Sequence, residues 1–155
     1  MSEAERPRAR VERASAADAA ALARLAAASL PSEAWSAGGF AEEIQSPVSR
    51  VWLVRDPAGE PIAYLAAQRV LDELQLLSLA VAVPHRRHGL GRALVEHALA
   101  SEVALASAHL EVRCNDAGAQ AFYRSLCFRP SGRRAAFYPG GIDAISMSRD
   151  ARCSG

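Results

Sequence analysis

The segment from Leu74 to Ala104 constrains the fold more than any other, because an apolar strand passes directly into a glycine-opened helix. Pro84 ends the strand, and Gly89-Leu90-Gly91 precedes a helix with apolar residues on one face. A strand joined to a helix in this way needs further strands beside it and helices over the sheet. The segment therefore predicts an α/β (α+β) protein.

The strand itself, Leu74–Val83, changes face along its length. Leu74 and Leu76 alternate with polar residues, and the alternation restarts one residue later at Leu77 and Leu79. A strand cannot change faces without an extra residue, which indicates a β-bulge near residues 76–78. The alternative is a central strand buried on both faces, where alternation disappears.

The rest of the chain alternates between strands and helices without a repeat or an interdomain linker. Expected strands are Arg10–Ala14, Arg50–Arg55, Ile62–Val70, Ala108–Cys114, Phe128–Phe137 and Asp143–Ser148. Expected helices run from an N-cap at Ser15 to Ser29, from Trp35 to Gln45 and from Ala117 to Leu126. Asp56-Pro57-Ala58-Gly59 is a turn. We expect one domain, residues 1–155, with loose tails at 1–8 and 150–155, built as a three-layer sandwich.

Charge and composition exclude several classes of function. The net charge is +1 and aromatic residues are few, which argues against nucleic acid or a membrane surface as a partner. All 18 basic residues are Arg, so a phosphate loop of the Walker type and lysine-based catalysis are excluded.

The cysteines and histidines do not form a recognisable metal site. Cys114, Cys127 and Cys153 have the spacing of neither a metal knuckle nor a redox pair. His85 and His88 lie close together without a carboxylate or thiolate partner, so we expect no metal. The odd number of cysteines and the polar start of the chain indicate the cytoplasm.

The loop between the bulged strand and its helix has the chemistry of a phosphate cradle. Its residues are Arg86, Arg87, His88, Gly89, Leu90, Gly91 and Arg92. Glycines let the backbone approach a ligand, the helix N-terminus offers free amides, and arginines add charged donors. A dinucleotide fingerprint would require Gly or Ala where Leu94 stands. An arginine-rich turn without a ligand remains the alternative.

The spacing Arg86-x-x-Gly89-x-Gly91 resembles the acyl-CoA motif of the GNAT superfamily. Flanking blocks extend the likeness from about residue 10 to 149. They are Trp35-Ser36 with Phe40, Leu71-Asp72-Glu73, Leu79-Ala80-Val81, Gly89 to His97, Leu110-Glu111-Val112-Arg113, Ala121-Phe122-Tyr123, Leu126-Cys127-Phe128, Tyr138-Pro139 and Asp143-Ala144. Together they resemble the RimI-type alanine N-acetyltransferases of bacterial ribosomal proteins.

The resemblance implies a GNAT fold that binds acetyl-CoA. Such a fold has a mixed, mostly antiparallel sheet of about six to seven strands, with a splayed bulged strand and about four flanking helices. The resemblance assigns the pantetheine arm to the backbone of Leu79, Ala80 and Val81, and the pyrophosphate to residues 86–92. It assigns a further cofactor contact to Asp116, where the family has Asn, or to Asn115 in its place.

The resemblance also assigns the catalytic pair and the acceptor site. Glu111 would take the proton of the attacking amine, and Tyr123 would donate a proton to the departing thiolate. Trp35, Glu73 and Tyr138 would contact the acceptor; the alternatives are a packing role for Trp35, which its position favours, and an exposed turn residue for Glu73. Judged by their positions alone, Glu111 could be a solvated residue or an Arg partner, and Tyr123 a packing residue. Cys127 replaces a Gly of the family and would be strained if that position has positive φ.

The acceptor predicted from the resemblance is a protein N-terminus, most often Ala-initiated ribosomal protein eighteen of the small subunit. Ile142-Asp143-Ala144 departs from the family here and bears on acceptor selection. Two rival interpretations are acetylation of a small amine, and an acyl-CoA-binding interaction module without turnover. The sequence leaves the oligomeric state open.

Overall fold

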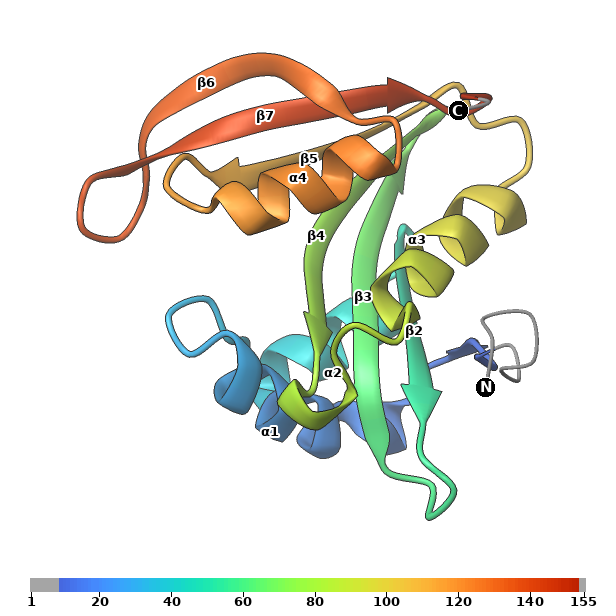
Figure 1. The fold of residues 1–155 in the computed structure, drawn as a ribbon. Coiled ribbons are helices and arrows are strands. Elements are labelled where there is room, and N and C mark those ends of the chain that lie inside the picture. The colour runs from blue at the N-terminus through green and yellow to red at the C-terminus, as the bar shows by residue number, and fades with distance from the viewer. Residues whose placement is uncertain (1–8, 154–155) are drawn as a thin grey trace.

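The computed structural model describes residues 9–153, so the predicted tail at 1–8 lies outside the described residues. These residues form a seven-stranded sheet in the order β1-β2-β3-β4-β5-β7-β6 (Figure 1). Only β4 and β5 pair in parallel; all other neighbours are antiparallel. The strands are β1 Glu12–Arg13, β2 Ser49–Arg55, β3 Pro61–Val70, β4 Glu73–Val81, β5 Ser107–Arg113, β6 Arg129–Tyr138 and β7 Ile142–Asp150.

Four α-helices and two short 3₁₀ turns accompany the sheet in the described part of the chain. They are η2 Ala16–Asp18, α1 Ala19–Ser29, α2 Ala37–Gln45, η3 Val83–His85, α3 Leu90–Ser101 and α4 Ala117–Ser125. Helices α1 and α2 pack on one face of the sheet through a buried cluster that includes Leu22, Phe40 and Tyr64. Helix α3 packs on the other face through Leu94 and Val95, and α4 lies beside it. The predicted three-layer, mostly antiparallel architecture is therefore confirmed.

Strand β4 carries the predicted bulge. Ala66 of β3 pairs with Ser78, whereas Ala67 pairs with Leu76, so Leu77 has no partner on β3. Leu76 before the bulge and Leu79 after it both contact the same core cluster. The extra residue is what keeps Leu79 on the same face of β4 as Leu76.

The parallel pair β4 and β5 separates soon after it forms. Their register runs only from Glu73 opposite Ser107 to Gln75 opposite His109. Beyond Gln75 the two strands diverge, as Figure 1 shows between β4 and the β5–β7–β6 part of the sheet. The β4 backbone from residue 76 onward is therefore unpaired on its β5 side, within the described residues.

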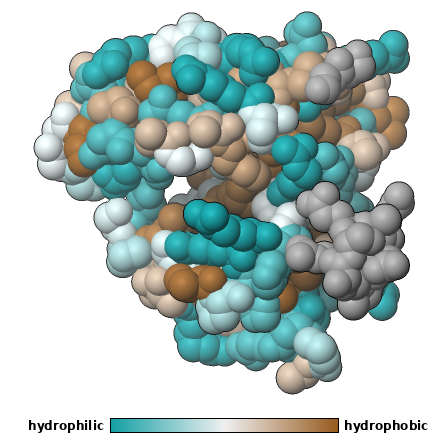
Figure 2. Space-filling view, viewed as in Figure 1, coloured by the Kyte–Doolittle hydropathy of each residue, from teal (hydrophilic) through white to brown (hydrophobic). Residues whose placement is uncertain are grey.

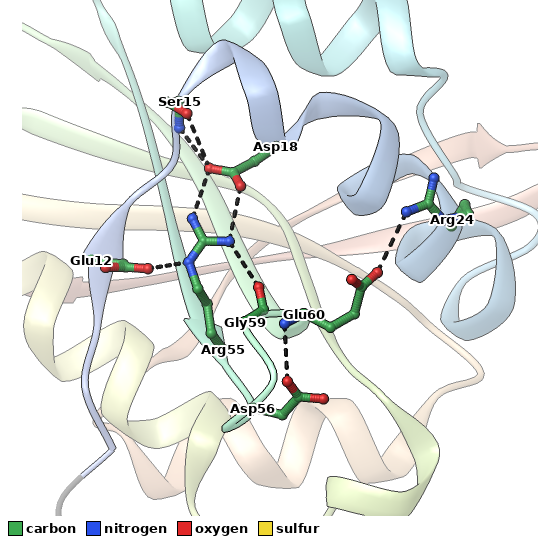
Figure 3. Close-up of polar contacts among 8 residues, drawn as sticks. All are labelled: Glu12, Ser15, Asp18, Arg24, Arg55, Asp56, Gly59 and Glu60. Carbon is green, nitrogen blue, oxygen red and sulfur yellow. Dashed lines mark hydrogen bonds and ion pairs between the residues drawn. The ribbon is translucent and has the colours of Figure 1, made fainter.

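Arg55 joins the start of the chain to the sheet (Figure 3). Its guanidinium contacts Glu12 of β1, Asp18 of η2 at 2.9 Å and the Gly59 carbonyl at 3.2 Å. Burial alone would raise the pKa of Asp18, but hydrogen bonds from Arg55 and Ser15 outweigh it and lower that pKa. This network fixes the entry to α1 on its face of the sheet.

Several element ends differ from the sequence predictions. Helix α3 stops at Ser101 rather than near Ala104, because Glu102 adopts extended backbone and pairs with Arg50 and Arg69. The predicted second helix starts at Ala37 rather than Trp35, with Ser36 accepting a hydrogen bond from the Gly39 amide as its N-cap. The predicted strand from Leu74 ends at Val81, and η3 follows.

Residues 150–153 are more ordered than the predicted tail at 150–155, whose last two residues lie outside the described part of the chain. Strand β7 includes Asp150, and the Ala151 amide donates to the Ala106 carbonyl at 2.9 Å. Cys127 and Cys153 form a disulfide that the cysteine spacing did not indicate. Within residues 9–153, none of the helices has the length and apolar character that crossing a bilayer requires.

Candidate active site

A cavity of about 530 Å³ occupies the space where β4 and β5 diverge. Figure 2 shows the surface hollowed there, between the part built from β5, β6, β7 and α4 and the part built from α1 and α2. Its lining comes from both faces of the sheet. The polar lining residues are Glu33, Gln75, Ser78, Glu111, Arg113, Asp116, Tyr123, Arg134 and Tyr138. Two of them, Glu111 and Tyr123, are the predicted catalytic pair.

Glu111 lies near the middle of β5, with a side chain that is 15% exposed. One carboxylate oxygen accepts a 2.5 Å hydrogen bond from the Ser146 hydroxyl of β7. The other lies 3.4 Å from Nε of Arg134 on β6. Arg113 also lines the cavity, but its ion pair is with Glu33. The base candidate is thus held in place and still reaches the cavity.

Tyr123 projects into the cavity from α4, on the opposite side from α1 and α2. Its ring packs edge-on against Phe122 and Phe128. Burial raises the pKa of its hydroxyl above the ordinary value, and the nearby Tyr138, Asp116 and Glu33 act in the same direction. The hydroxyl therefore remains protonated at neutral pH, as a proton donor must.

Arg113 and Tyr138 close the side of the cavity that faces α1 and α2. The Arg113 guanidinium lies 4.6 Å from the centre of the Tyr138 ring, 3.5 Å from Glu33 and 3.1 Å from the Ser32 hydroxyl. Burial raises the pKa of Tyr138 to about 12, and the carboxylates of Glu33 and Glu111 contribute to the increase. These contacts join β5 and β6 to the segment between α1 and α2.

The predicted phosphate loop has the backbone geometry of a ligand cradle. Gly89 is left-handed with a φ of +79°, and Arg87 also has a positive φ of 66°. Helix α3 begins directly after Gly89. Its first amides have no carbonyl one turn earlier within the helix, so they are available to an anion, and the positive end of the helix dipole favours one.

The loop lies beside the cavity because Gly91 allows a close approach. A methyl group at Gly91 would lie 3.2 Å from the Phe122 ring of α4 and 3.8 Å from Leu79 of β4. Leu79 lines the cavity as well, so it connects the cavity with the loop.

The arginines of the loop are partly engaged with the protein. Arg86 donates to the Val81 carbonyl at 3.0 Å, and Arg92 donates to the Ser125 hydroxyl at 3.0 Å. Arg87 and His88 are exposed. The backbone amides at the start of α3 and the side chains of Arg87 and His88 are therefore the donors that this loop offers to a ligand.

The structure shows the local geometry at two departures from the family pattern, Asp116 and Cys127. Asp116 accepts a 2.9 Å hydrogen bond from the Ala119 amide, so it caps α4 and lines the cavity, while Asn115 is exposed. Cys127 has a φ of 73°, which confirms that this position is left-handed.

The predicted acceptor residues do not all reach the cavity. Trp35 lines it and packs on Phe40, with the ring centres 5.3 Å apart. Glu73 does not, because it begins β4 at the end where β4 and β5 are paired, 3.7 Å from His109.

Sequence reasoning missed the lining residues Glu33, Arg134 and Phe137, together with Ser146 behind Glu111. They come from a loop, an edge strand and a neighbouring strand, where no local pattern singles out a site. No group of three or more potential metal ligands occurs within residues 9–153.

Comparison with known proteins points to the same family as the sequence motifs. The sequence profile of the acetyltransferase (GNAT) family matches residues 19–128. The [ribosomal protein bS18]-alanine N-acetyltransferase of Escherichia coli K12 is 41% identical over 95 residues, which cover 58% of this chain and 64% of that protein.

Two solved structures superpose over nearly the whole chain. The crystal structure of the ribosomal-protein-S18-alanine N-acetyltransferase from Escherichia coli has a TM-score of 0.84 at 31% identity, covering 94% of this chain and 96% of that one. Ard1 from Thermoplasma volcanium has a TM-score of 0.82 at 24% identity, covering 93% and 98%, and supports the fold alone.

Proposed function

The chain belongs to the acetyltransferase (GNAT) family, and from this premise we propose that it transfers the acetyl group of acetyl-CoA to the α-amino group of a protein N-terminus. One observation carries the proposal. The cavity between the diverging strands brings together Glu111 and Tyr123, and it adjoins a helix N-terminus opened by glycine. A base, an acid and an anion cradle are the three parts that this transfer needs.

Acetyl-CoA is a substrate of the proposed reaction, and three features fit its parts. The free edge of β4 around Leu79, Ala80 and Val81 offers backbone groups to the pantetheine arm, which would bind there like an added strand. The amides at the start of α3, with Arg87 and His88 nearby, suit the pyrophosphate. Asp116 is engaged in capping α4, so we assign it no hydrogen-bond donation to the cofactor.

The acceptor amine needs a base because an α-amine has a pKa of about 8 and is mostly protonated at neutral pH. In the proposed mechanism, the ammonium gives one proton to Glu111, directly or through water. The nitrogen lone pair then attacks the thioester carbonyl, and a β4 amide near Val81 stabilises the oxyanion.

The second half of the reaction expels the thiol. The C–S bond breaks as the tetrahedral centre collapses, and Tyr123 donates a proton to the leaving sulfur. The nitrogen loses its second proton, which restores Tyr123 through solvent, and Glu111 releases the first one. The products are an acetylated amide and CoA, with one proton released overall.

The acceptor we propose is an N-terminus beginning with Ala, in the counterpart of the ribosomal protein named for the Escherichia coli relatives. Carboxylates of Glu33 and Glu111 line the acceptor side and attract an ammonium group. Phe137, which is 47% exposed at the cavity, offers an apolar contact to the residues that follow. Ribosomal proteins are made in the cytoplasm, where we place this activity.

Mass spectrometry of acetylated peptides tests the proposal. With acetyl-CoA, a basic Ala-initiated peptide should be acetylated at least tenfold faster than free amino acids or polyamines. Faster acetylation of free amines would instead favour a small-molecule acetyltransferase. Acetyl-CoA binding by calorimetry without turnover on peptides of varied first residue would favour an interaction module.

The two catalytic roles are tested separately by Glu111→Gln and Tyr123→Phe. We expect each to lower kcat by about 10²–10⁴ fold, the range of general acid–base catalysis. The affinity for acetyl-CoA, measured by calorimetry, should stay within about twofold of the wild type, because neither side chain is assigned a contact with the pyrophosphate or the pantetheine arm. Full activity in both variants would remove the mechanism while leaving the acyl transfer itself intact.

A further inference from the structure

We infer that Ser146 and Arg134 position the Glu111 carboxylate differently: Ser146 fixes one oxygen throughout the reaction, whereas Arg134 covers the other only until the amine arrives. The inference rests on the proposed function, because it concerns the acceptance of a proton by Glu111. It names the oxygen that takes the proton and a cation that competes with the acceptor.

Ser146 is placed opposite Glu111 by the sheet. The two residues are register partners in the antiparallel pair of β5 and β7. Side chains of such partners project from the same face, and here the hydroxyl donates to Oε2 at 2.5 Å. On the next strand Gly132 lies opposite Ser146, where a methyl group would come within 3.8 Å of the Ser146 Cβ. Ser146 is therefore held in the sheet, and the hydrogen bond does not depend on a mobile loop.

Arg134 reaches Glu111 in a different way. It belongs to β6, the edge strand, and extends past β7 to bring Nε within 3.4 Å of Oε1. Its side chain is 62% exposed, and the guanidinium also lies 5.6 Å from the centre of the Phe137 ring. An exposed arginine held by one long ionic contact and an aromatic ring is weakly fixed. It can leave without breaking the sheet.

These two contacts differ in what they leave free for catalysis. Oε2 already accepts the hydrogen bond from the Ser146 hydroxyl, so Oε1 is the oxygen that accepts the proton from the ammonium. A guanidinium and an ammonium cannot share that oxygen without repulsion between like charges. The acceptor therefore displaces Arg134 as it binds, and Arg134 acts in the free protein alone.

The other charged or titratable groups around Glu111 come from β5, α4, β6 and the loop before α2, and they stay the same in the variants below. They are Arg113 on β5, Glu33 before α2, Asp116 and Tyr123 at α4, and Tyr138 on β6. Differences between variants can therefore be assigned to the residue that is changed. Ionisation of the peptide amine is likewise common to all of them.

Ser146 is tested by the kinetics of peptide acetylation. Ser146→Ala removes the donor to Oε2, so the carboxylate is no longer oriented with Oε1 toward the acceptor. We expect kcat to fall about tenfold at pH 8 while KM for the peptide stays within about twofold. Ser146→Thr keeps the hydroxyl and should restore kcat. Ser148→Ala, on the same face of β7 opposite His109, is the control.

Arg134→Gln should change only one of the two kinetic constants. We expect KM for the peptide to fall about threefold at pH 8, because the competing cation is gone. The value of kcat should match the wild type, because the acceptor has already displaced the arginine. Arg133→Gln removes the same charge from the adjacent residue, whose partner is Asp143 at 2.8 Å, and should change neither. A lower kcat or an unchanged KM in Arg134→Gln would overturn the inference.

A measurement on the free protein separates this inference from the proposed function. The carbon-13 signal of the Glu111 carboxyl can be assigned by its loss in Glu111→Gln. Its chemical shift at pH 7 should change in Ser146→Ala, which removes the hydrogen bond to Oε2, and in Arg134→Gln, which removes the guanidinium from Oε1, but not in the two controls. An unchanged chemical shift in either test variant would refute the inference even in an active enzyme. Absence of peptide acetylation by the wild type would refute the proposed function alone.

Discussion

Gly89 and Gly91 are needed for different reasons, although both lie at the start of α3. Gly89 has a φ of +79° and open space around it, so only its backbone conformation excludes a side chain. Gly91 has ordinary backbone, but a methyl group there would press on the Phe122 ring at 3.2 Å. The first glycine shapes the loop, and the second lets α3 approach α4.

The left-handed backbone of Gly89 predicts that Ala and Asn have unequal effects at this position. Gly89→Ala should lower the free energy of unfolding by about 1–2 kcal/mol, the cost of a left-handed residue with a Cβ. Gly89→Asn should cost less, because Asn tolerates that conformation. Urea denaturation at neutral pH measures both.

Gly59 supplies the matched control for Gly89, because it also has positive φ and open space but lies in the β2–β3 turn, away from the cavity. Gly59→Ala should lose similar stability and keep its affinity for acetyl-CoA. Equal stability of Gly89→Ala and the wild type would contradict the strain argument.

At the scale of elements, the sequence identified β4 and its bulge because a shift of face leaves a direct trace in the alternation of Leu74, Leu76 and Leu79. Short motifs and a family likeness predicted the loop and the pair of Glu111 and Tyr123, and the structure places that pair in one cavity. The contacts of Glu111 could not be predicted, because they depend on the register of β5 against β7 and on the reach of an edge strand.

The ends of helices and strands could not be predicted from the local sequence where tertiary contacts determine them. The apolar pattern of α3 continues past Ser101, yet ion pairs of Glu102 with Arg50 and Arg69 stop the helix there. The disulfide of Cys127 with Cys153 depends on α4 and β7 ending side by side, and sequence spacing does not encode this. In a reducing compartment these two residues are thiols.

The disulfide predicts a stability that depends on redox conditions. Cys127 and Cys153 are 26 residues apart, and a crosslink of that loop length stabilises a fold by about 3 kcal/mol. Cys153→Ser should therefore unfold at lower urea concentration than the oxidised wild type. With excess dithiothreitol the two proteins should unfold together. Cys114→Ser, at the free cysteine, is the control and should match the wild type in both conditions. Insensitivity of the wild type to reductant would show that the bond does not stabilise the fold.

At the scale of the whole molecule, all three tyrosines of the chain gather around the cavity. Tyr123 and Tyr138 line it, and Tyr64 lies beneath it with its hydroxyl 2.7 Å from that of Ser78. Burial is the first cause of a raised pKa for each of them. The folded protein therefore retains phenol protons that the unfolded chain would release.

This arrangement predicts alkaline instability. The stabilisation is fully present below pH 10, the ordinary pKa of tyrosine, and is lost as the pH rises toward 12, where Tyr138 titrates. Urea denaturation between pH 8 and 11 should show this decline, and phenolate absorbance should rise only with unfolding. Tyr123→Phe should flatten the decline. Full ionisation of the folded protein near pH 10 would contradict the prediction.

The separation of β4 from β5 gives the cavity lining from both faces of the sheet: Glu33 and Trp35 from the α1–α2 side, and Tyr123 from the α4 side. In the proposed reaction, each reactant can therefore contact the cavity from its own face of the sheet. The proposed reaction then predicts a ternary complex with both reactants bound, and no acetylated form of the protein.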